Sequence, residues 1–317
     1  MAHRINFIKE CQIGTHVEIE GLISNIDIKQ KQNKENFLMV TIIDSEDELI
    51  FPIWDNVEAR YEKMKVGQIL TVIGTVSEYD KNRQIRVSQL AIRDMKDEER
   101  SDFIASYKIK DSDIQNFLKV IDQLSEPYKT VVKEALGVED KTKWNAFLMA
   151  PAAVRHHHNK LGGLFIHTSG VMYAAINIVD NYTTHPFHVN ASNVINRDRV
   201  VSAAILHDVC KREEYKYHPM ISYGDNRFDH RLKFLPYIES INNKLIQEGK
   251  PHFEADELEL LQELVLTHHG PWGGYKPKTI EGLIIFLADM TDSQIVGCAE
   301  NNNPSVRMTI SSMMDAE

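Results

Sequence analysis

The chain of 317 residues is longer than one hydrophobic core usually supports, so we expect two domains. Its 43% hydrophobic and 26% charged residues are typical of a globular protein, and we expect no membrane span. The net charge of −10 argues against a broad surface that binds duplex nucleic acid through counterion release. The first residues lack a signal-peptide pattern and the three cysteines are widely spaced. We therefore expect a cytoplasmic protein with no disulfide framework.

Residues from about 13 to 95 have strand patterns, with polar and apolar residues alternating at period two in 16–28, which predicts a β-rich first domain over residues 1–95. Turn residues separate five predicted strands, and a short helix is predicted at 57–64, between the third and fourth strands. Five strands with a helix in this position are typical of a small Greek-key barrel of the OB type. Gly21 and Gly74 fall inside strands, where such a barrel must bend sharply. The predicted strands are 16–28, 37–43, 48–54, 68–76 and 84–92.

OB barrels bind single-stranded nucleic acid on the second and third strands and on the loops beside them. Here those loops carry basic residues, and aromatic residues for base stacking lie on the strands. For any single one of Phe37, Phe51 and Trp54, a place in the barrel core is the better interpretation. The candidate binding residues are Lys29, Lys31, Lys34, Phe37, Trp54, Lys81, Arg83 and Arg86.

Residues 96–110 are charged and poor in apolar side chains, so we expect a linker there. In residues 111–317, apolar side chains recur three and four positions apart and no strand pattern is evident. This periodicity predicts an all-helical bundle. The predicted helices are 111–124, 128–136, 144–149, 163–179, 197–211, 228–247, 255–269 and 279–296.

Twelve of the 14 histidines lie between positions 156 and 269, which is compositional evidence for a metal site. The doublet His207-Asp208 ends an apolar run, where buried polar groups need partners that a divalent metal can supply. Taken alone, the doublet is equally compatible with an ordinary charged helix end. With four further segments there are enough ligands for two ions, and Asp208 is the candidate bridge. The candidate ligands are His167, His207, Asp208, His230, His268, His269 and Asp289.

The order of these segments carries a recognisable pattern. His157-His158 precede Gly162-Gly163 and His167, and then follow the segments 205–211, 266–274 and 277–292. The pattern resembles the HD-domain metal-dependent phosphohydrolases, and most of all the YhaM-type 3′-to-5′ exoribonucleases, which join an OB fold to an HD domain. The resemblance implies one metal held by His167, His207, Asp208 and Asp289, and a second held by Asp208, His230, His268 and His269.

The same resemblance assigns roles around the metals. Lys211 would face the scissile phosphate, and His157 or His158 would orient phosphate or donate a proton. The segment between Lys211 and His230 is hard to align, so His218 is a rival to His230 as a ligand. The family usually has glycine at the position of Cys210. A thiol there could change the metal preference or the redox sensitivity.

The resemblance implies a metal-dependent 3′-to-5′ exonuclease that acts on single-stranded RNA, or on DNA, and releases 5′-mononucleotides through a metal-activated hydroxide. We expect two divalent ions, with Mn²⁺ as first choice and Mg²⁺, Fe²⁺, Co²⁺ or Ni²⁺ as alternatives. A homo-oligomer is compatible with the sequence. Two other functions stay open: a phosphohydrolase of small nucleotides with a regulatory OB domain, and a catalytically inactive nucleic-acid-binding module.

Overall fold

The computed structural model describes residues 3–31, 33–79, 82–153, 157–185, 190–216, 221–224 and 228–300. They divide into two compact units, of which the first runs to Ser106 and the second begins at Tyr107. The domain boundaries drawn from composition stay predictions.

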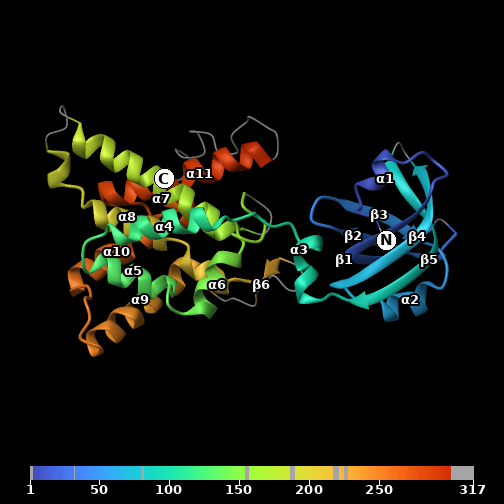
Figure 1. Ribbon diagram of the computed structural model, residues 1–317, viewed down its shortest axis with the longest axis horizontal. Helices are drawn as coiled ribbons and strands as arrows, with labels where there is room; N and C mark the ends of the chain where they lie inside the picture. Colours follow the sequence, from blue (N-terminus) through green and yellow to red (C-terminus); the bar gives the residue numbers. More distant parts are fainter. Residues whose placement is uncertain are drawn as a thin grey trace. The chain divides into compact units, whose positions relative to one another are not determined.

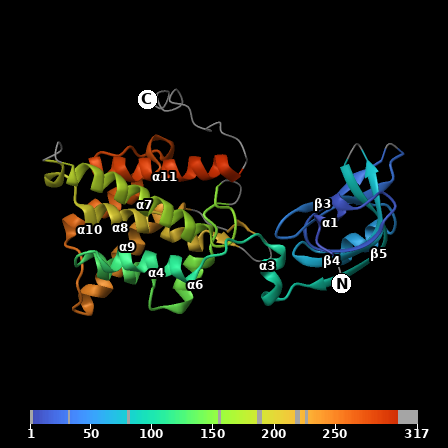
Figure 2. The ribbon, with the colours of Figure 1, turned by 45° about the horizontal axis from the view of Figure 1, so that its top comes forward.

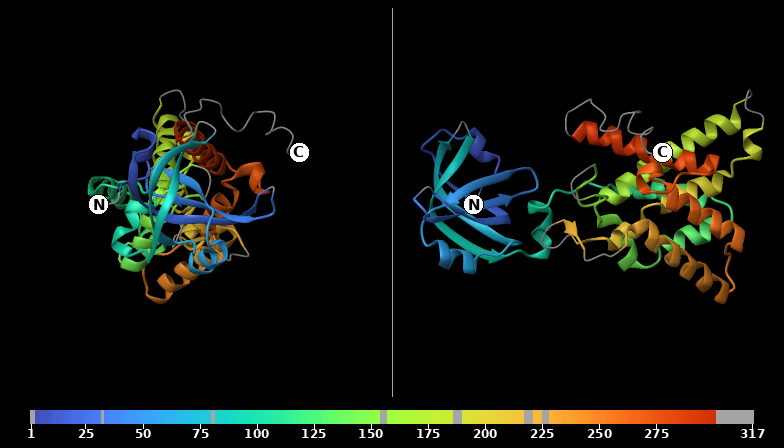
Figure 3. Two further views of the ribbon diagram at one scale, coloured as in Figure 1. Left: turned by 90° about the vertical axis from the view of Figure 1, so that its right-hand side faces the viewer. Right: turned by 180° about the vertical axis from the view of Figure 1, so that it is seen from behind.

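The first unit is built on a five-stranded antiparallel sheet with the strand order β3-β2-β1-β4-β5 (Figure 1). The helix α2 (Val57–Lys63) connects β3 to β4, as predicted. β3 at one edge of the sheet contacts β5 at the other, so the sheet curls into a barrel (Figure 3). This confirms the predicted OB-type architecture. The strands are β1 (His16–Gln30), β2 (Asn36–Ile43), β3 (Glu48–Ile53), β4 (Gln68–Tyr79) and β5 (Asn82–Asp94).

The barrel closes around alternate side chains of its strands. In β2, Leu38, Val40 and Ile42 are fully buried, and the residues between them are only partly buried. Gly74 lies in the pairing of β4 with β5, at the point where the register of the two strands shifts. A Cβ atom at Gly74 would lie 2.3 Å from the backbone oxygen of Arg86, so only glycine fits this bend.

The second unit is a bundle of helices (Figures 1 and 2). The two longest helices, α7 and α11, lie side by side, and α8 packs against both. Their apolar faces form one continuous core with α5, α9 and α10. The bundle helices are α4 (Asp111–Asp122), α5 (Tyr128–Leu136), α6 (Lys141–Met149), α7 (Gly163–Thr184), α8 (Arg197–Leu206), α9 (His230–Gln247), α10 (Ala255–Thr267) and α11 (Ile280–Glu300).

Two predicted helices end earlier than their sequence pattern indicated. The helix predicted at 197–211 stops at Leu206, and a separate 3-10 helix, η3 (Val209–Glu213), follows. The helix predicted at 255–269 stops at Thr267 and is followed by η4 (Gly270–Gly273). Neighbouring residues on an α-helix point about 100° apart. Ending the helix therefore lets two consecutive polar side chains turn toward one centre.

A short pairing of strands was not predicted in this unit. β6 (Tyr215–Lys216) pairs with β7 (Ser222–Tyr223) in antiparallel fashion. Two residues per strand are too few for a period-two pattern to be recognised.

Among the described residues, one helix, α11, has the length and apolar composition of a membrane span. A single helix of this kind is weak evidence, because helices that pack inside a protein pass the same test. α11 packs against α7, α8 and α10, with Leu283 and Leu287 each 41% exposed.

Candidate metal centre

Polar side chains from five segments converge in the interior of the helical unit. His167 lies in the second turn of α7, and His207 and Asp208 follow the end of α8. The remaining members lie at the start of α9, just after α10, and in the middle of α11. The helices that carry or flank these residues all belong to the hydrophobic core, so the packing of the core positions the polar groups. The residues brought together are His167, His207, Asp208, His230, His268, His269 and Asp289.

One oxygen of Asp208 faces the first group of side chains. Asp208 Oδ2 lies 3.4 Å from His167 Nε2 and 3.3 Å from His207 Nε2. Asp289 Oδ1 lies 3.2 Å from the same His167 nitrogen. His167, His207 and Asp289 therefore offer ligand atoms within 4.8 Å of one another.

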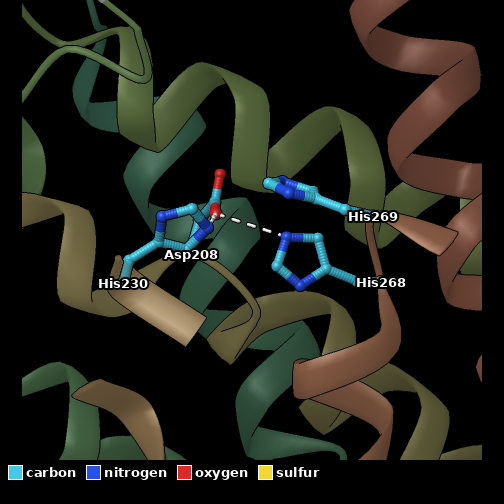
Figure 4. Close-up of side chains that lie close together, drawn as sticks. All are labelled: Asp208, His230, His268 and His269. Atoms are coloured by element: carbon cyan, nitrogen blue, oxygen red, sulfur yellow. Dashed lines mark ion pairs between the residues drawn. The ribbon is translucent and has the colours of Figure 1, made fainter. Parts of the chain in front are cut away.

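The other oxygen of Asp208 faces the second group (Figure 4). Asp208 Oδ1 lies 3.1 Å from His230 Nε2 and 3.6 Å from His268 Nε2. His269 completes this group, with its ring 4.2 Å from that of His268. A carboxylate with one oxygen toward each group has the arrangement of a bridging ligand.

The imidazole rings are held with their Nε2 atoms toward Asp208. His207 Nδ1 lies 2.8 Å from the backbone oxygen of Ala204, and His268 Nδ1 lies 2.6 Å from that of Val265. These oxygens can only accept, so each Nδ1 carries the proton and donates it. The Nε2 lone pair of each ring is therefore free to bind a cation.

Several buried acceptors at the centre lack hydrogen-bond donors. Both carboxylate oxygens of Asp208 and the Nε2 atoms of His230 and His268 have no hydrogen-bond partner among the described residues. Unsatisfied groups of this kind each cost about 1–3 kcal/mol. Divalent cations would satisfy all of them, and imidazole with carboxylate is a ligand set that such cations accept. The residues of the centre therefore fit a divalent metal, and its clusters could hold metal.

The protonation states of Asp208 and His269 suit a cation. Burial would raise the pKa of Asp208, but Lys211, His207 and His230 hold it well below its ordinary value. Burial lowers the pKa of His269 to about 3. A carboxylate that stays ionised and an imidazole that stays neutral are the forms that bind metal. At His167 and His230 burial would lower the pKa of the imidazole, but the nearby carboxylates outweigh this effect and raise it, so a cation would displace a proton there.

Two residues of the segment after Asp208 have different environments. Lys211 is buried, and its Nζ lies 2.7 Å from Asp208 Oδ2 as an ion pair outside the hydrogen-bonding angles. Cys210 is buried in the hydrophobic core, and burial raises the pKa of its thiol to about 12. Cys210 belongs to none of the metal-binding groups found among the described residues. The expected influence of its thiol on the metals has no support in this geometry.

The two neighbouring histidines before α7 have different surroundings. His158 is buried and its Nε2 lies 2.9 Å from Asp292 Oδ2. The ring of His157 lies 5.3 Å from that of His167, and burial lowers its pKa to about 3. The charges of His167 and Lys211 lower the pKa of His157 further. The rival ligand His218 lies outside the described residues.

The sequence pattern missed two carboxylates that support this centre. Asp292 Oδ2 lies 2.8 Å from His167 Nδ1, and Glu214 Oε2 lies 2.9 Å from His230 Nδ1. The one signal available for Asp292 was its position three residues after Asp289, on the same helix face. Glu214 follows η3 and had no periodic signal.

Three of the candidate nucleic-acid-binding residues of the barrel lie together: Lys31, Phe37 and Trp54. Trp54 is 54% exposed and stacks on Phe37 with 4.7 Å between ring centroids. Lys31 Nζ lies 4.9 Å from the centroid of the Trp54 ring. Phe51 is fully buried, so a role in base stacking is wrong for this residue.

The other basic candidates lie on the surface of the first unit. Lys29, Lys34 and Arg86 are exposed, and Arg83 forms an ion pair of 3.0 Å with Glu78. Lys81 lies outside the described residues.

Comparisons with known proteins match both units. Residues 164–294 match the HD domain family, and residues 17–93 match the family of OB-fold nucleic acid binding domains. Similar curated proteins include the 3′-5′ exoribonuclease YhaM of Listeria innocua serovar 6a, 26% identical over 291 residues, which are 90% of this chain and 87% of that protein. The proteins of the same name from Listeria welshimeri serovar 6b and Listeria monocytogenes serotype 4b are 25% and 24% identical, with the same coverage of both chains.

Among solved structures, RecG bound to a three-way DNA junction aligns with a TM-score of 0.25 and 14% identity, over 57% of this chain and 25% of that chain. A likeness at this level carries no argument about function.

Proposed function

We propose that this chain, in which an OB-fold nucleic-acid-binding domain precedes an HD domain, is a metal-dependent 3′-5′ exonuclease of single-stranded RNA. The observation that carries the proposal is Asp208, whose two oxygens face two separate groups of imidazoles inside the HD domain. Relatives named 3′-5′ exoribonuclease, similar over 90% of the chain, support the direction of cleavage and the choice of RNA.

In this proposal His167, His207 and Asp289 would hold one divalent cation, and His230, His268 and His269 a second, with Asp208 shared by both. Mn²⁺ is our first choice for both positions. Bound cations would supply acidified water and positive charge beside the phosphoryl oxygens.

The protein's own side chains would bind and orient the scissile phosphate. Lys211 keeps its positive charge because Asp208 raises its pKa despite burial, so it can neutralise a phosphoryl oxygen as negative charge accumulates. His157 is neutral, since its pKa is about 3, and its ring can donate an N–H hydrogen bond to the phosphate. Release of a 5′-mononucleotide requires a water oxygen to bond to phosphorus while the bond from phosphorus to the O3′ of the preceding nucleotide breaks. Water loses a proton in this step, and the O3′ oxygen takes one up.

The OB domain would hold the strand through base stacking. The exposed ring of Trp54, stacked on the partly buried Phe37 and with Lys31 over the indole, combines an aromatic platform with a positive charge. Stacking of this type tolerates any base, as an exonuclease that degrades a strand stepwise requires.

The test is a 20-nucleotide single-stranded RNA incubated with the full chain and Mn²⁺. With the label at the 5′ end we expect a ladder that shortens from the 3′ end, and with the label at the 3′ end we expect immediate release of a labelled 5′-mononucleotide. The matched control is Asp208→Asn, which should lose cleavage and keep strand binding, measured by fluorescence anisotropy. A DNA strand of the same sequence measures the preference between RNA and DNA.

Internal cuts, or cleavage that survives in Asp208→Asn, would contradict the proposal. Turnover of nucleoside triphosphates or cyclic nucleotides with no shortening of the RNA would favour a phosphohydrolase of small nucleotides.

A further inference from the structure

We propose that Asp292 and Glu214 are positioning residues, each of which orients one imidazole and thereby sets the affinity of one of the two metal positions. The inference rests on the metal positions of the proposed function. It assigns a role to two carboxylates that would not touch metal or substrate themselves.

Asp292 lies behind His167 on the side away from Asp208. α11 carries Asp289 and Asp292 three residues apart, so both carboxylates reach the same ring from one helix. Asp289 approaches His167 Nε2 at 3.2 Å, and Asp292 accepts a hydrogen bond from His167 Nδ1 at 2.8 Å. His158 Nε2 donates to the same Asp292 oxygen at 2.9 Å, so two imidazoles hold this carboxylate in place.

The neighbouring helix makes room for Asp292. Gly170 lies inside α7, where glycine costs about 1 kcal/mol relative to alanine. A Cβ atom at Gly170 would lie 2.0 Å from Asp292 Oδ1. The glycine is therefore explained by the close approach of this carboxylate.

Glu214 has the equivalent place behind His230. His230 Nδ1 lies 2.9 Å from Glu214 Oε2, while His230 Nε2 faces Asp208. The backbone of Glu214 is fixed at both ends, because its N–H donates to Lys211 and its oxygen accepts from Gly224. The carboxylate is thus held by the same segment that carries Asp208.

The two groups of ligands share a pattern. In each, one ring donates to a backbone oxygen, as His207 and His268 do, and one ring donates to a carboxylate. A carboxylate that accepts a hydrogen bond from Nδ1 makes the Nε2 atom of the same ring a stronger metal ligand, and it fixes the plane of the ring. Loss of such a partner typically weakens metal binding about 10- to 100-fold. Each metal position therefore depends on one carboxylate that can be removed by mutation.

The experiment is calorimetric titration of Mn²⁺ into the chelator-treated full chain. Asp292→Asn should weaken one binding step about 10- to 100-fold and leave the other within about threefold. Glu214→Gln should weaken the opposite step. The matched controls are Asp256→Asn and Glu239→Gln, which change exposed carboxylates on α10 and α9 and should leave both steps unchanged.

A second variant reaches the same carboxylate from the other side. Gly170→Ala keeps Asp292 but displaces it, and it should weaken the same step as Asp292→Asn, even where the latter does not fold. Electron paramagnetic resonance gives an independent reading. At two equivalents of Mn²⁺ per chain, Asp292→Asn or Glu214→Gln should show an isolated ion where the parent chain shows a coupled pair.

The outcomes separate this inference from the proposed function. A parent chain that binds two ions but does not shorten RNA overturns the exonuclease and leaves the positioning roles standing. Folded variants that bind both ions as tightly as the parent, or that lose both steps equally, overturn the positioning roles and leave the exonuclease standing.

Discussion

Lys211 is a buried lysine at the candidate metal centre, and removing its charge gives a direct test of its role. Its ammonium lies 2.7 Å from Asp208 Oδ2. In the proposed mechanism it would supply a positive charge beside the scissile phosphate and would compete with cations for this oxygen. Lys211→Met keeps the length of the side chain and removes the charge. We expect kcat for RNA to fall about 10²-fold, since a phosphoryl oxygen loses one stabilising partner.

Metal binding should respond in the opposite sense to this change. Without the ammonium, Mn²⁺ should bind Lys211→Met as tightly as the parent chain, or more tightly, in a calorimetric titration. Lys233→Met, on the first turns of α9, is the matched control and should leave both kcat and affinity unchanged. A large loss of Mn²⁺ affinity in Lys211→Met would place the lysine among the supports of the centre instead.

At the scale of single residues, the sequence predicted which histidines and aspartates would lie together, and the structure places them together. Histidine on an apolar helix is rare enough to be noticed one position at a time. Their roles as metal ligands stay predictions. Asp292 and Glu214 escaped notice because an isolated carboxylate near a helix end is common, and only its contact with an imidazole distinguishes it.

Helices α5, α8, α10 and α11 are tied together by a charged network remote from the aspartates of the centre. Arg199 donates to both oxygens of Glu257, at 2.7 and 2.6 Å, and to Glu281 at 2.9 Å. Tyr128 donates to Glu257 at 2.7 Å. Arg199, Glu257 and Glu281 are mostly shielded from water, so the network should contribute to stability.

The stability that Glu257 contributes should depend on pH. Burial would raise its pKa, but the hydrogen bonds from Arg199 and Tyr128 lower it below the value of an unfolded chain. The contribution is therefore complete above the unfolded pKa of about 4.3 and is lost as the pH falls through the folded value. Glu257→Gln should cost about 2 kcal/mol at pH 7 and progressively less below pH 4, measured by urea unfolding.

The control for this prediction is Glu259→Gln, an exposed residue on the same helix. Its free energy of unfolding should follow that of the parent chain at every pH. A constant difference between Glu257→Gln and the parent from pH 7 to pH 3 would contradict the assigned pKa.

The bend of β4 at Gly74 gives a prediction for the barrel. In Gly74→Ala the new Cβ would meet the backbone oxygen of Arg86, which cannot move without breaking the β4–β5 pairing. We expect the free energy of unfolding of the first unit to fall by about 1–3 kcal/mol, measured by thermal unfolding. In Gly21→Ala the Cβ would meet only the side chain of Ile42, at 3.0 Å, so the loss should be smaller. Equal losses of stability in Gly74→Ala and Gly21→Ala would show that the bend at Gly74 is not the reason for its glycine.

At the scale of elements, the periodicity of apolar residues predicted all five strands and the bundle helices, because each has one face in a core. It overran the ends of α8 and α10, where the residues that follow, His207 and His268, are buried although they are polar. Periodicity records burial and not backbone hydrogen bonding, so a buried residue beyond a helix end is counted as part of the helix.

At the scale of the whole molecule, strand binding and chemistry should be separable by mutation. Trp54→Ala removes the exposed ring of the stacked pair, and we expect binding of single-stranded RNA to weaken by about 1–3 kcal/mol. Hydrolysis of bis(p-nitrophenyl) phosphate, which needs no strand, should be unchanged.

Tyr61→Ala is the control for this change, since Tyr61 is an exposed aromatic residue of α2 in the same unit. It should leave RNA affinity as it is. If Trp54→Ala and Tyr61→Ala bind RNA equally well in anisotropy measurements, the face with Trp54 does not hold the strand.

The division into a strand-rich half and a helical half was predictable because each half has its own periodicity, of two and of about 3.6 residues. The HD domain was predictable only from the order of its histidine and aspartate segments. The pairing of Tyr215 with Tyr223 was not predictable, since it is too short to have a period.

The spacing of Asp289 and Asp292 on α11 has a mechanical consequence. One rigid helix delivers both the carboxylate that faces the Nε2 atom of His167 and the one that faces its Nδ1 atom, and it packs along the helix that bears this ring. Any displacement of α11 therefore removes both at once. The metal position at His167 should thus be lost in a single step, so that release of Mn²⁺ from it and loss of helical circular dichroism coincide along a denaturant gradient. Release well before the helices melt would show that the centre can open while its scaffold stays folded.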